Sequence, residues 1–441
     1  MSYLDNILFA IILAIGFGYF AGNVKKLLRN IKLGQAVNRT DKSSERWKNM
    51  AMIALGQSKM VKRPIAGVLH IIVYVGFVII NLELLEIIID GLFGTHRVFA
   101  FLGGFYNILI ASFEILALLV IAAVVVFWLR RNVINLKRFV SSDLKNWPKS
   151  DANYILYFEI VLMSLFLIMN ASDLALQQRF VHHYTEAGSF PISQLITPIF
   201  NGLSDGVVVV IERTAWWLHI CGILVFLNYL YFSKHLHILL AFPNTYFADL
   251  NPKGKFDNLE SVTNEVKLML DPSADPFAAP TNPEAVPSKF GASDVQDLNW
   301  VQLLNAYTCT ECGRCTSSCT ANQTGKKLST PKIMMDTRDR LEEVGKNMDT
   351  NNGVFVPDNK SLLNDYITTE ELWACTSCNA CVEECPVNIS PLSIIMDMRR
   401  YLVMEQSAAP MSLNAMMTNI ENNGAPWQYN QMDRLNWKDE N

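Results

Sequence analysis

Hydrophobic positions dominate the first 245 residues and fall into five long runs that polar or charged stretches separate. A helix needs roughly 20 apolar residues to cross a bilayer core of about 30 Å. The runs cover residues 4–24, 65–89, 105–129, 154–174 and about 214–241. Buried helices of a large soluble protein rarely give such runs in quick succession. The pattern therefore predicts five membrane spans.

Lysine and arginine are shared unevenly between the connecting segments. Residues 25–63 and 130–149, which follow the first and third runs, are rich in both, whereas the other two connections hold few. Basic loops stay on the cytoplasmic side of a membrane. This asymmetry predicts a multi-pass protein of the bacterial inner membrane, with a periplasmic N-terminus and a cytoplasmic C-terminal part.

The apolar pattern stops near residue 245. Residues 246–288 are polar and proline-rich, which predicts a flexible cytoplasmic linker. We expect a small domain over residues 289–403 and a C-terminal tail, 404–441, that docks a partner. The predicted fold class is a membrane α-helical bundle of five spans (1–245) plus a small, mostly α-helical ferredoxin-like domain with two [4Fe-4S] clusters.

Composition supports this division and excludes some functions. The 441 residues are 51% hydrophobic and only 18% charged, against about 25% charged in ordinary soluble domains. A net charge of −4 argues against nucleic acid as a partner. The chain has no phosphate-binding glycine motif that would indicate nucleotide binding.

Cysteine spacing carries the clearest chemical signal. Eight of the nine cysteines form two motifs that both read C-x2-C-x2-C-x3-C. Three thiolates at this spacing hold one [4Fe-4S] cluster, and the fourth reaches the other cluster. The predicted ligand sets are Cys309, Cys312, Cys315 and Cys385 for one cluster, and Cys375, Cys378, Cys381 and Cys319 for its twin. Zinc is the alternative, but four-ligand zinc sites do not explain a third closely spaced cysteine in both motifs.

Histidines inside the predicted spans suggest a second cofactor. His70 and His237 each lie about six residues from the cytoplasmic end of a span, roughly 9 Å deep. Two imidazoles at equal depth can hold the iron of one b-type haem from both sides. His219, on the same predicted helix face as His237, suits a second haem, although the outer half of span two has no histidine. His235 is an alternative to His237, and a quinone pocket without haem is an alternative to both.

Two acidic residues also fall inside predicted spans. Glu114 lies near the middle of the third span, and Glu159 lies about level with His70 in the fourth. Ionisable residues in a membrane need a functional or structural reason. They could carry the protons of a quinol, or they could pair with a neighbouring helix.

Short motifs add a family resemblance to this picture. Phe290-Gly-Ala, Leu298-Asn-Trp and above all Cys381-Val-Glu-Glu-Cys-Pro-Val-Asn-Ile resemble the ferredoxin-like part of the heterodisulfide reductase D-type iron–sulfur oxidoreductases. Longer members of that family continue into Cys-Cys-Gly domains, whereas no cysteine follows Cys385 here. The resemblance implies a separate Cys-Cys-Gly subunit as partner, with a flavoprotein or dehydrogenase upstream.

The membrane half resembles another protein family. Five spans with His70, His219 and Ser233-Lys-His-Leu-His237 are similar to the cytochrome b (gamma) subunit of respiratory nitrate reductase, in which four histidines hold two haems. Carried over, His70 and His237 match the cytoplasmic-side pair. His219 matches one ligand of the outer pair, and its mate falls near Ile80.

Together these features predict a membrane-anchored electron-transfer subunit. It would pass electrons between a cytoplasmic redox partner and the quinone pool through two [4Fe-4S] clusters and one haem b, and it would need a separate catalytic subunit. A first alternative is a reductase of disulfide-type substrates, although the chain lacks cysteines for a third cluster. A second is a membrane-tethered iron–sulfur sensor without haem.

Overall fold

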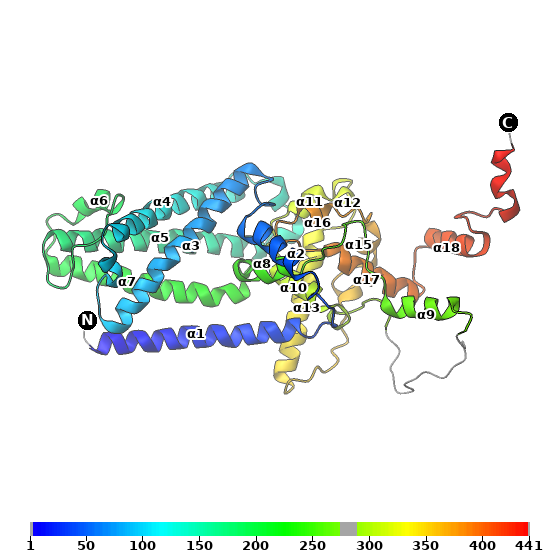
Figure 1. Ribbon diagram of the computed structural model, residues 1–441, viewed down its shortest axis with the longest axis horizontal. Helices are drawn as coiled ribbons and strands as arrows, with labels where there is room; N and C mark the ends of the chain where they lie inside the picture. The colour runs from blue at the N-terminus through cyan, green and yellow to red at the C-terminus, as the bar shows by residue number, and fades with distance from the viewer. Residues whose placement is uncertain (1–2, 274–288, 440–441) are drawn as a thin grey trace.

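A computed structural model describes residues 3–273 and 289–439, which are mainly helical and contain no named strand. Five long helices make up one end of the molecule. They are α1 (Tyr3–Ile31), α3 (Pro64–Phe93), α4 (Gly104–Asn132), α5 (Trp147–Gln178) and α7 (Asp205–Tyr229). Most run along its long axis, and α3 crosses them obliquely (Figure 1). Each of the five gives a segment long and apolar enough to cross a membrane, which confirms the prediction of five spans. We call these five helices the membrane lobe.

The membrane lobe is apolar on its outside as well as between its helices. Helix α5 packs against α4 and α7, α3 packs against α4, and α1 packs against α7 and α3. Between the helices, Ile110 and Phe166 are fully buried, whereas Ile11 and Val78 on the outer face are half exposed. Such an apolar outer face suits lipid, because a hydrocarbon environment covers it without losing hydrogen bonds.

The predicted boundaries of the fifth span were wrong. Helix α7 begins at Asp205 and ends at Tyr229, and the apolar segment after it turns through two short 3-10 helices, η6 (Leu230–Phe232) and η7 (Lys234–Leu236). The pattern missed the start of α7 because Glu212 and Arg213 interrupt it, yet these two side chains pair with each other. His237 therefore does not share a helix with His219, and the predicted common helix face does not exist.

The second lobe, residues 289–404, surrounds the cysteine motifs with helices. In chain order they are α10 (Trp300–Thr308), α11 (Arg314–Ser318), α12 (Thr320–Gln323), α13 (Thr330–Thr350), α14 (Leu362–Asp365), α15 (Thr369–Ala374), α16 (Ala380–Glu384) and α17 (Pro391–Met404). Side-chain caps fix several starts: Asn299 caps α10 and Thr368 caps α15, each with a reciprocal bond from the third residue of the helix. We call this part the cluster lobe.

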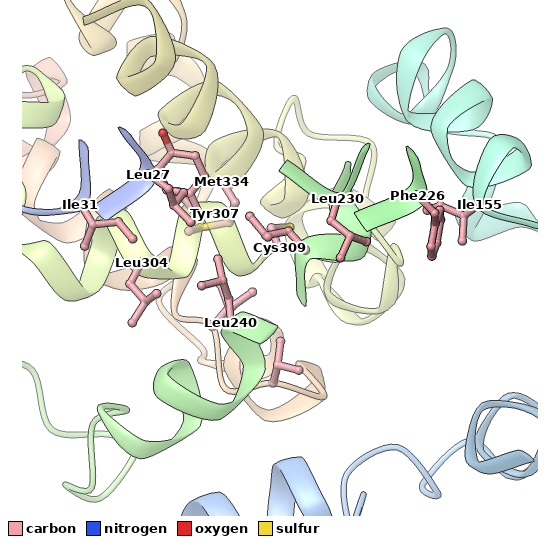
Figure 2. Packing of buried hydrophobic residues seen from close by; sticks show 14 of the residues in the cluster. Leu27, Ile31, Ile155, Phe226, Leu230, Leu240, Leu304, Tyr307, Cys309 and Met334 are labelled. Carbon is pink, nitrogen blue, oxygen red and sulfur yellow. The ribbon is translucent and has the colours of Figure 1, made fainter. Parts of the chain in front are cut away.

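The two lobes share one hydrophobic core. Buried side chains continue from Leu27 and Phe226 of the membrane lobe to Tyr307 and Met334 of the cluster lobe, and Figure 2 shows this passage. Helix α8 (His237–Tyr246) packs against α10, as does α1. The cluster lobe is therefore fixed against the membrane lobe.

Polar bonds reinforce the same interface. The Asn30 amide donates to the Tyr307 hydroxyl at 2.9 Å, and the Asn244 amide donates to the carbonyl of Val387 at 2.7 Å. The backbone of Gln35 pairs with the segment just before α10, like a single rung of a sheet. Buried polar groups at such an interface are costly unless they are paired, so these bonds also specify how the lobes dock.

The predicted linker and tail differ in their structure. Within 246–288, helix α9 (Glu260–Leu270) is present, and residues 274–288 lie outside the described residues. The tail holds α18 (Met411–Asn423) and the 3-10 helix η9 (Gln431–Lys438), neither with a buried residue. Both stand apart from the rest of the molecule (Figure 1), and the docking role of the tail stays a prediction.

Candidate redox site

The two cysteine motifs adopt the same backbone course. In each motif the residue before the second cysteine has a positive φ, 50° at Glu311 and 57° at Ser377. The residue after that cysteine does too, 68° at Gly313 and 60° at Asn379. Short helices, α11 and α16, follow the two loops and pack against each other. The repeated sequence spacing therefore becomes a repeated three-dimensional unit.

Gly313 has a second reason to be glycine. A Cβ atom at this position would lie 2.5 Å from the carbonyl oxygen of Arg138, in the loop between α4 and α5. Since such a distance is shorter than any real contact, only glycine lets the first cysteine loop approach the membrane lobe. In the second loop Asn379 accepts the left-handed conformation, which asparagine tolerates.

The first cysteine set lies together between the lobes. Burial raises the pKa of Cys309 to about 12, and the charges of Cys312 and Cys385 add to the shift. Burial also raises the pKa of Cys385 to about 11, with Cys312 again beside it. Burial raises the pKa of Cys315 as well, and the charges of all three other cysteines add to the shift. The fold thus brings together Cys309, Cys312, Cys315 and Cys385, the set that the spacing predicts.

The second cysteine set gathers in the same crossed manner. Burial raises the pKa of Cys381 to about 12, and the neighbouring charges of Cys375, Cys319 and Cys378 contribute. Cys319, which belongs to the first motif in sequence, thus lies with the second. Cys378 is exposed, unlike the other three. Ligation of a cluster by each set stays a prediction.

Backbone N–H groups point at sulfur atoms in both sets. The N–H of Ser377 donates to Cys375 Sγ at 3.4 Å, and that of Ile389 donates to Cys385 Sγ at 3.3 Å. Such bonds stabilise thiolate and tune cluster potentials. Among the described residues, no three His, Cys, Asp or Glu side chains meet as they would around a single metal ion.

Positive charge surrounds the first set. Burial lowers the pKa of Lys59 to about 8, although the Cys385 thiolate opposes this shift. Burial likewise lowers the pKa of Arg138 to about 10, and the Cys312 thiolate opposes it. Arg314 donates to the carbonyls of Lys59 and Met60 at 3.2 Å, in the turn that precedes α3. These cations suit a negatively charged group held by the first set.

The structure brings the rings of His70 and His237 close together. Their ring centroids lie 6.4 Å apart, with 39° between the ring planes. An imidazole nitrogen binds a metal at about 2.0–2.1 Å, so two rings that share one metal have centroids roughly 6 Å apart. The predicted pair therefore has the spacing of a two-histidine metal site, although His237 reaches it from the start of α8.

Hydrogen bonds also suit ligation at this pair. His237 Nδ1 lies 3.0 Å from the carbonyl oxygen of Lys234, so Nδ1 carries the hydrogen and Nε2 keeps its lone pair. Metal-bound histidines are typically held in this way. His70 Nδ1 is buried without a partner among the described residues. His235, whose ring lies 5.4 Å from that of His237, stays an alternative ligand.

His219 lies elsewhere, in a cavity between α3, α5 and α7. The cavity has a volume of about 90 Å³, and Ile80 and Glu83 line it from α3. His219 and Ile80 thus line the same cavity, and no second histidine lines it. Glu159 also lines it.

Glu114 has a structural partner instead. Its carboxylate accepts from the backbone N–H groups of Ile192 and Ser193 at 2.9 and 3.1 Å. It therefore anchors the segment that leads into α6 (Ser193–Ile196). Of the two alternatives for this residue, pairing within the bundle fits the structure.

Sequence reasoning missed a buried charged network at the end of the membrane lobe opposite the cluster lobe. Arg97 is 7% exposed and donates to Asp173 at 2.6 Å, while His96 bonds the other oxygen of Asp173 at 3.0 Å. His96 and Arg97 fall in a loop, so the sequence offered no sign that they turn inward. Asp173 in a predicted span was the available signal.

Comparison with known proteins identifies the cluster lobe. Residues 305–389 match the model of the 4Fe-4S dicluster domain. The chain is 31% identical to the probable iron–sulfur-binding oxidoreductase FadF of Bacillus subtilis, over 99% of this chain and 61% of that protein. It is 26% identical to the EtfAB:quinone oxidoreductase of Syntrophomonas wolfei, over 92% of this chain and 55% of that protein.

Further similarity is restricted to part of the chain. A probable membrane-anchored ferredoxin of Chromohalobacter salexigens is 32% identical over 33% of this chain and 24% of its own length. No solved structure matches. The chain spans only about three fifths of the length of the first two relatives. The chain is thus a membrane protein that carries a 4Fe-4S dicluster domain and is related to iron–sulfur oxidoreductases.

Proposed function

We propose that this chain is a membrane-anchored electron-transfer subunit of the bacterial inner membrane. It passes electrons between a cytoplasmic redox partner and quinone. The dicluster domain and the five spans support this function, as does similarity to an EtfAB:quinone oxidoreductase. The cluster lobe lies on the cytoplasmic side, as the basic loops of the membrane lobe indicate.

The cysteine sets are the proposed ligands of two [4Fe-4S] clusters. When bound, such clusters supply one-electron transfer, whereas a quinone exchanges two electrons. The chain holds the two sites side by side, because each motif gives its fourth cysteine, Cys319 or Cys385, to the site of the other motif. Exposed Cys378 marks the solvent side of the second set.

One observation carries the proposal: the first cysteine loop bonds the segments that lead to His70 and His237, at the interface of the lobes. Lys234, which lies just before His237, donates to Glu311 of the first cysteine loop at 2.6 Å. Arg314 of the same loop bonds the segment that leads into α3, which carries His70. The fold therefore supports an electron path that runs from the solvent side to the second cysteine set, then to the first set and then to the histidine pair.

His70 and His237 are the proposed ligands of one b-type haem. The spacing of the rings, the hydrogen on His237 Nδ1 and the unpartnered His70 Nδ1 all fit this role. A haem-free iron–sulfur anchor or sensor is the alternative function. It explains the cysteines but gives no reason for two partly buried imidazoles with ring centroids 6.4 Å apart.

A separate subunit completes the proposed complex. Similarity to an EtfAB:quinone oxidoreductase supports such a partner. We infer that a Cys-Cys-Gly subunit binds the cluster lobe and that a flavoprotein or dehydrogenase exchanges electrons with it. The exposed tail, which includes Trp427 and Trp437, is the proposed contact.

Metal content and spectra of the full-length protein, purified anaerobically in detergent, test this function. Two clusters require about eight non-haem irons per chain, and stoichiometric zinc in their place would contradict the proposal. The dithionite-reduced minus oxidised spectrum should show the α band of a b-type haem.

Histidine variants then test the haem ligands. We expect His70→Ala and His237→Ala each to abolish the α band while iron in the clusters is retained. His235→Ala serves as the matched control and should keep the band. A band that survives in both ligand variants would refute the assignment, and its absence in the unmodified protein would favour the haem-free anchor.

A further inference from the structure

The cavity around His219 is separate from the cysteine sets and from the histidine pair. It holds about 90 Å³, roughly the space of six to nine waters or one flat ring. Most of its lining is apolar, including Ile80 and Phe166, and its polar groups are Asn81, Glu83, Glu159 and His219. An apolar pocket with a few converging polar groups is the usual form of a small-molecule site.

One nitrogen of His219 is prepared to accept a hydrogen bond. His219 is 3% exposed, and its Nδ1 lies 3.0 Å from the carbonyl oxygen of Leu162. Because a carbonyl only accepts, Nδ1 carries the hydrogen and Nε2 is a lone-pair acceptor. Nε2 has no hydrogen-bond partner in the described part of the chain, so a hydroxyl of a ligand in the cavity can donate to it.

Glu83 is the second polar group with an unused atom. It is 2% exposed; its Oε1 lies 3.4 Å from Arg97 Nη1, and its buried Oε2 has no partner among the described residues. A buried polar atom without a partner is costly, so it favours a ligand that can bond it. Glu86, one helical turn along α3, is in contrast satisfied by Tyr106 at 2.7 Å and by the N–H of Phe99 at 2.8 Å. Glu83 thus has a free oxygen at the cavity.

A second cavity continues from Glu83 toward the membrane face opposite the cluster lobe. It holds about 40 Å³ and is lined by Glu83, Arg97, Asp173 and His96 among others, with room for roughly three waters. Its charged groups come from α3, from the loop after α3, from α5 and, with Glu212 and Arg213, from α7. Glu83 is faced by Glu86 of α3, Arg97 of the loop after α3, Glu114 of α4 and Asp173 of α5.

The network ends at histidines near the surface. His96 Nδ1 accepts from the N–H of Thr185 at 3.2 Å, so its Nε2–H donates to Asp173. The ring of His183, which is exposed, lies 5.5 Å from that of His96. The charged groups of the second cavity thus end beside an exposed histidine, where protons can pass to water.

We propose that the cavity binds a quinone headgroup and that Glu83 exchanges the headgroup's protons with the membrane face opposite the cluster lobe. The inference rests on the proposed function and adds the site of quinone chemistry and the side on which protons appear. In oxidation of a hydroquinone, its two O–H bonds break and a quinone remains. Two electrons leave singly toward the chain's iron centres, and two protons leave in turn through Glu83 and water of the second cavity, past the Asp173–His96 pair. Quinone reduction reverses each step.

Reduction of the purified holoprotein by menadiol, a soluble hydroquinone, tests the proposal. We expect Glu83→Gln to slow reduction of the iron centres about 100-fold, the usual contribution of one proton-transferring group. Binding of heptyl-hydroxyquinoline N-oxide, followed by its fluorescence, should stay unchanged in Glu83→Gln and be lost in His219→Ala. Glu114→Gln is the matched control, because Glu114 is a buried acid of the membrane lobe with both oxygens bonded and lies outside both cavities, and it should reduce at the normal rate.

The side of proton release is measured in liposomes that enclose a pH-sensitive dye. Limited proteolysis of the cluster lobe reports which way the protein is inserted in the liposome. Protons should appear on the face opposite the cluster lobe, and His96→Gln should delay them. If Glu83→Gln fails to fold, Glu83→Asp, which keeps the carboxyl group, should reduce at an intermediate rate. Unchanged menadiol kinetics in the Glu83 variants would overturn this inference but not the proposed function. Protons on the cluster-lobe face would do the same. An unmodified holoprotein that menadiol cannot reduce would overturn the proposed function with it.

Discussion

Arg138 shows how a single residue can tune the proposed first cluster. Its guanidinium lies beside Cys312, its backbone touches Gly313, and its Nη1 atom has no hydrogen-bond partner among the described residues. A nearby positive charge favours the reduced, more negative state of a cluster. The residue therefore acts through its charge more than through its bonds.

We expect Arg138→Gln to lower the midpoint potential of the first cluster by about 30–60 mV, on the order of 1 kcal/mol for one electron. Redox titration followed by electron paramagnetic resonance measures this shift. Lys137→Gln removes an exposed charge one residue away and should shift the potential far less. Equal shifts in both variants would show that the effect is general charge and not proximity to Cys312.

At the scale of elements, the contact between α1 and α13 fixes how the lobes meet. Arg29 of α1 bonds the carboxylate of Asp349 and donates to the carbonyl of Gly345 at 3.0 Å. The hydrogen bond from Arg29 is the main reason that the pKa of Asp349 lies below its ordinary value of 3.8. A carboxyl group with a lowered pKa stabilises the folded state above its unfolded pKa, and this contribution is lost as the pH falls through its folded value.

We therefore expect Asp349→Asn to remove a small stabilisation that is present at pH 7 and lost below about pH 4. Because Asp349 is about one third exposed, the effect is about 0.2–1 kcal/mol and weakens in high salt. Thermal unfolding in detergent, followed by circular dichroism across pH, measures it. Asp339→Asn, on the same helix but bonded only to its neighbour Arg338, should leave the profile unchanged. A larger loss in that control would refute the role of the α1 contact.

At the scale of the whole molecule, the C-terminal tail is separable from the fold. Helix α18 and η9 contain no buried residue, while apolar side chains such as Met411, Trp427 and Trp437 are more than half exposed. Apolar groups that are left in water in this way favour association with another surface. In chain order, α17 is the last helix that packs against the rest of the molecule.

A chain that ends after Pro410 should consequently keep its iron content and its unfolding temperature. It should lose binding to a purified Cys-Cys-Gly subunit, measured by size-exclusion chromatography in detergent. The full-length chain with Trp427→Ala and Trp437→Ala tests whether these two side chains carry the contact. A fall of several degrees in the unfolding temperature of the shortened chain would show that the tail belongs to the fold.

The membrane lobe could be predicted in its elements but not in its interior. Five spans follow from apolar runs alone, because a bilayer demands about 20 apolar residues regardless of packing. The start of α7 was missed because Glu212 and Arg213 satisfy each other, which hydropathy along the chain does not register. The Arg97–Asp173–His96 network was missed for the same reason, since its members come from a loop and a span far apart in sequence.

The sequence by itself determined the cysteine grouping and the membrane character, because both depend on local spacing and composition. It also indicated His70 and His237, although for a helix that ends before His237. Only the tertiary structure decided that the first cysteine loop contacts the segments that lead to this histidine pair. The tertiary structure also decided that His219 lies apart from this pair and lines a cavity together with Glu83. These relations depend on how distant helices pack, and the physical reason is that the cost of a buried charge or an unpaired atom is set by its neighbours in space.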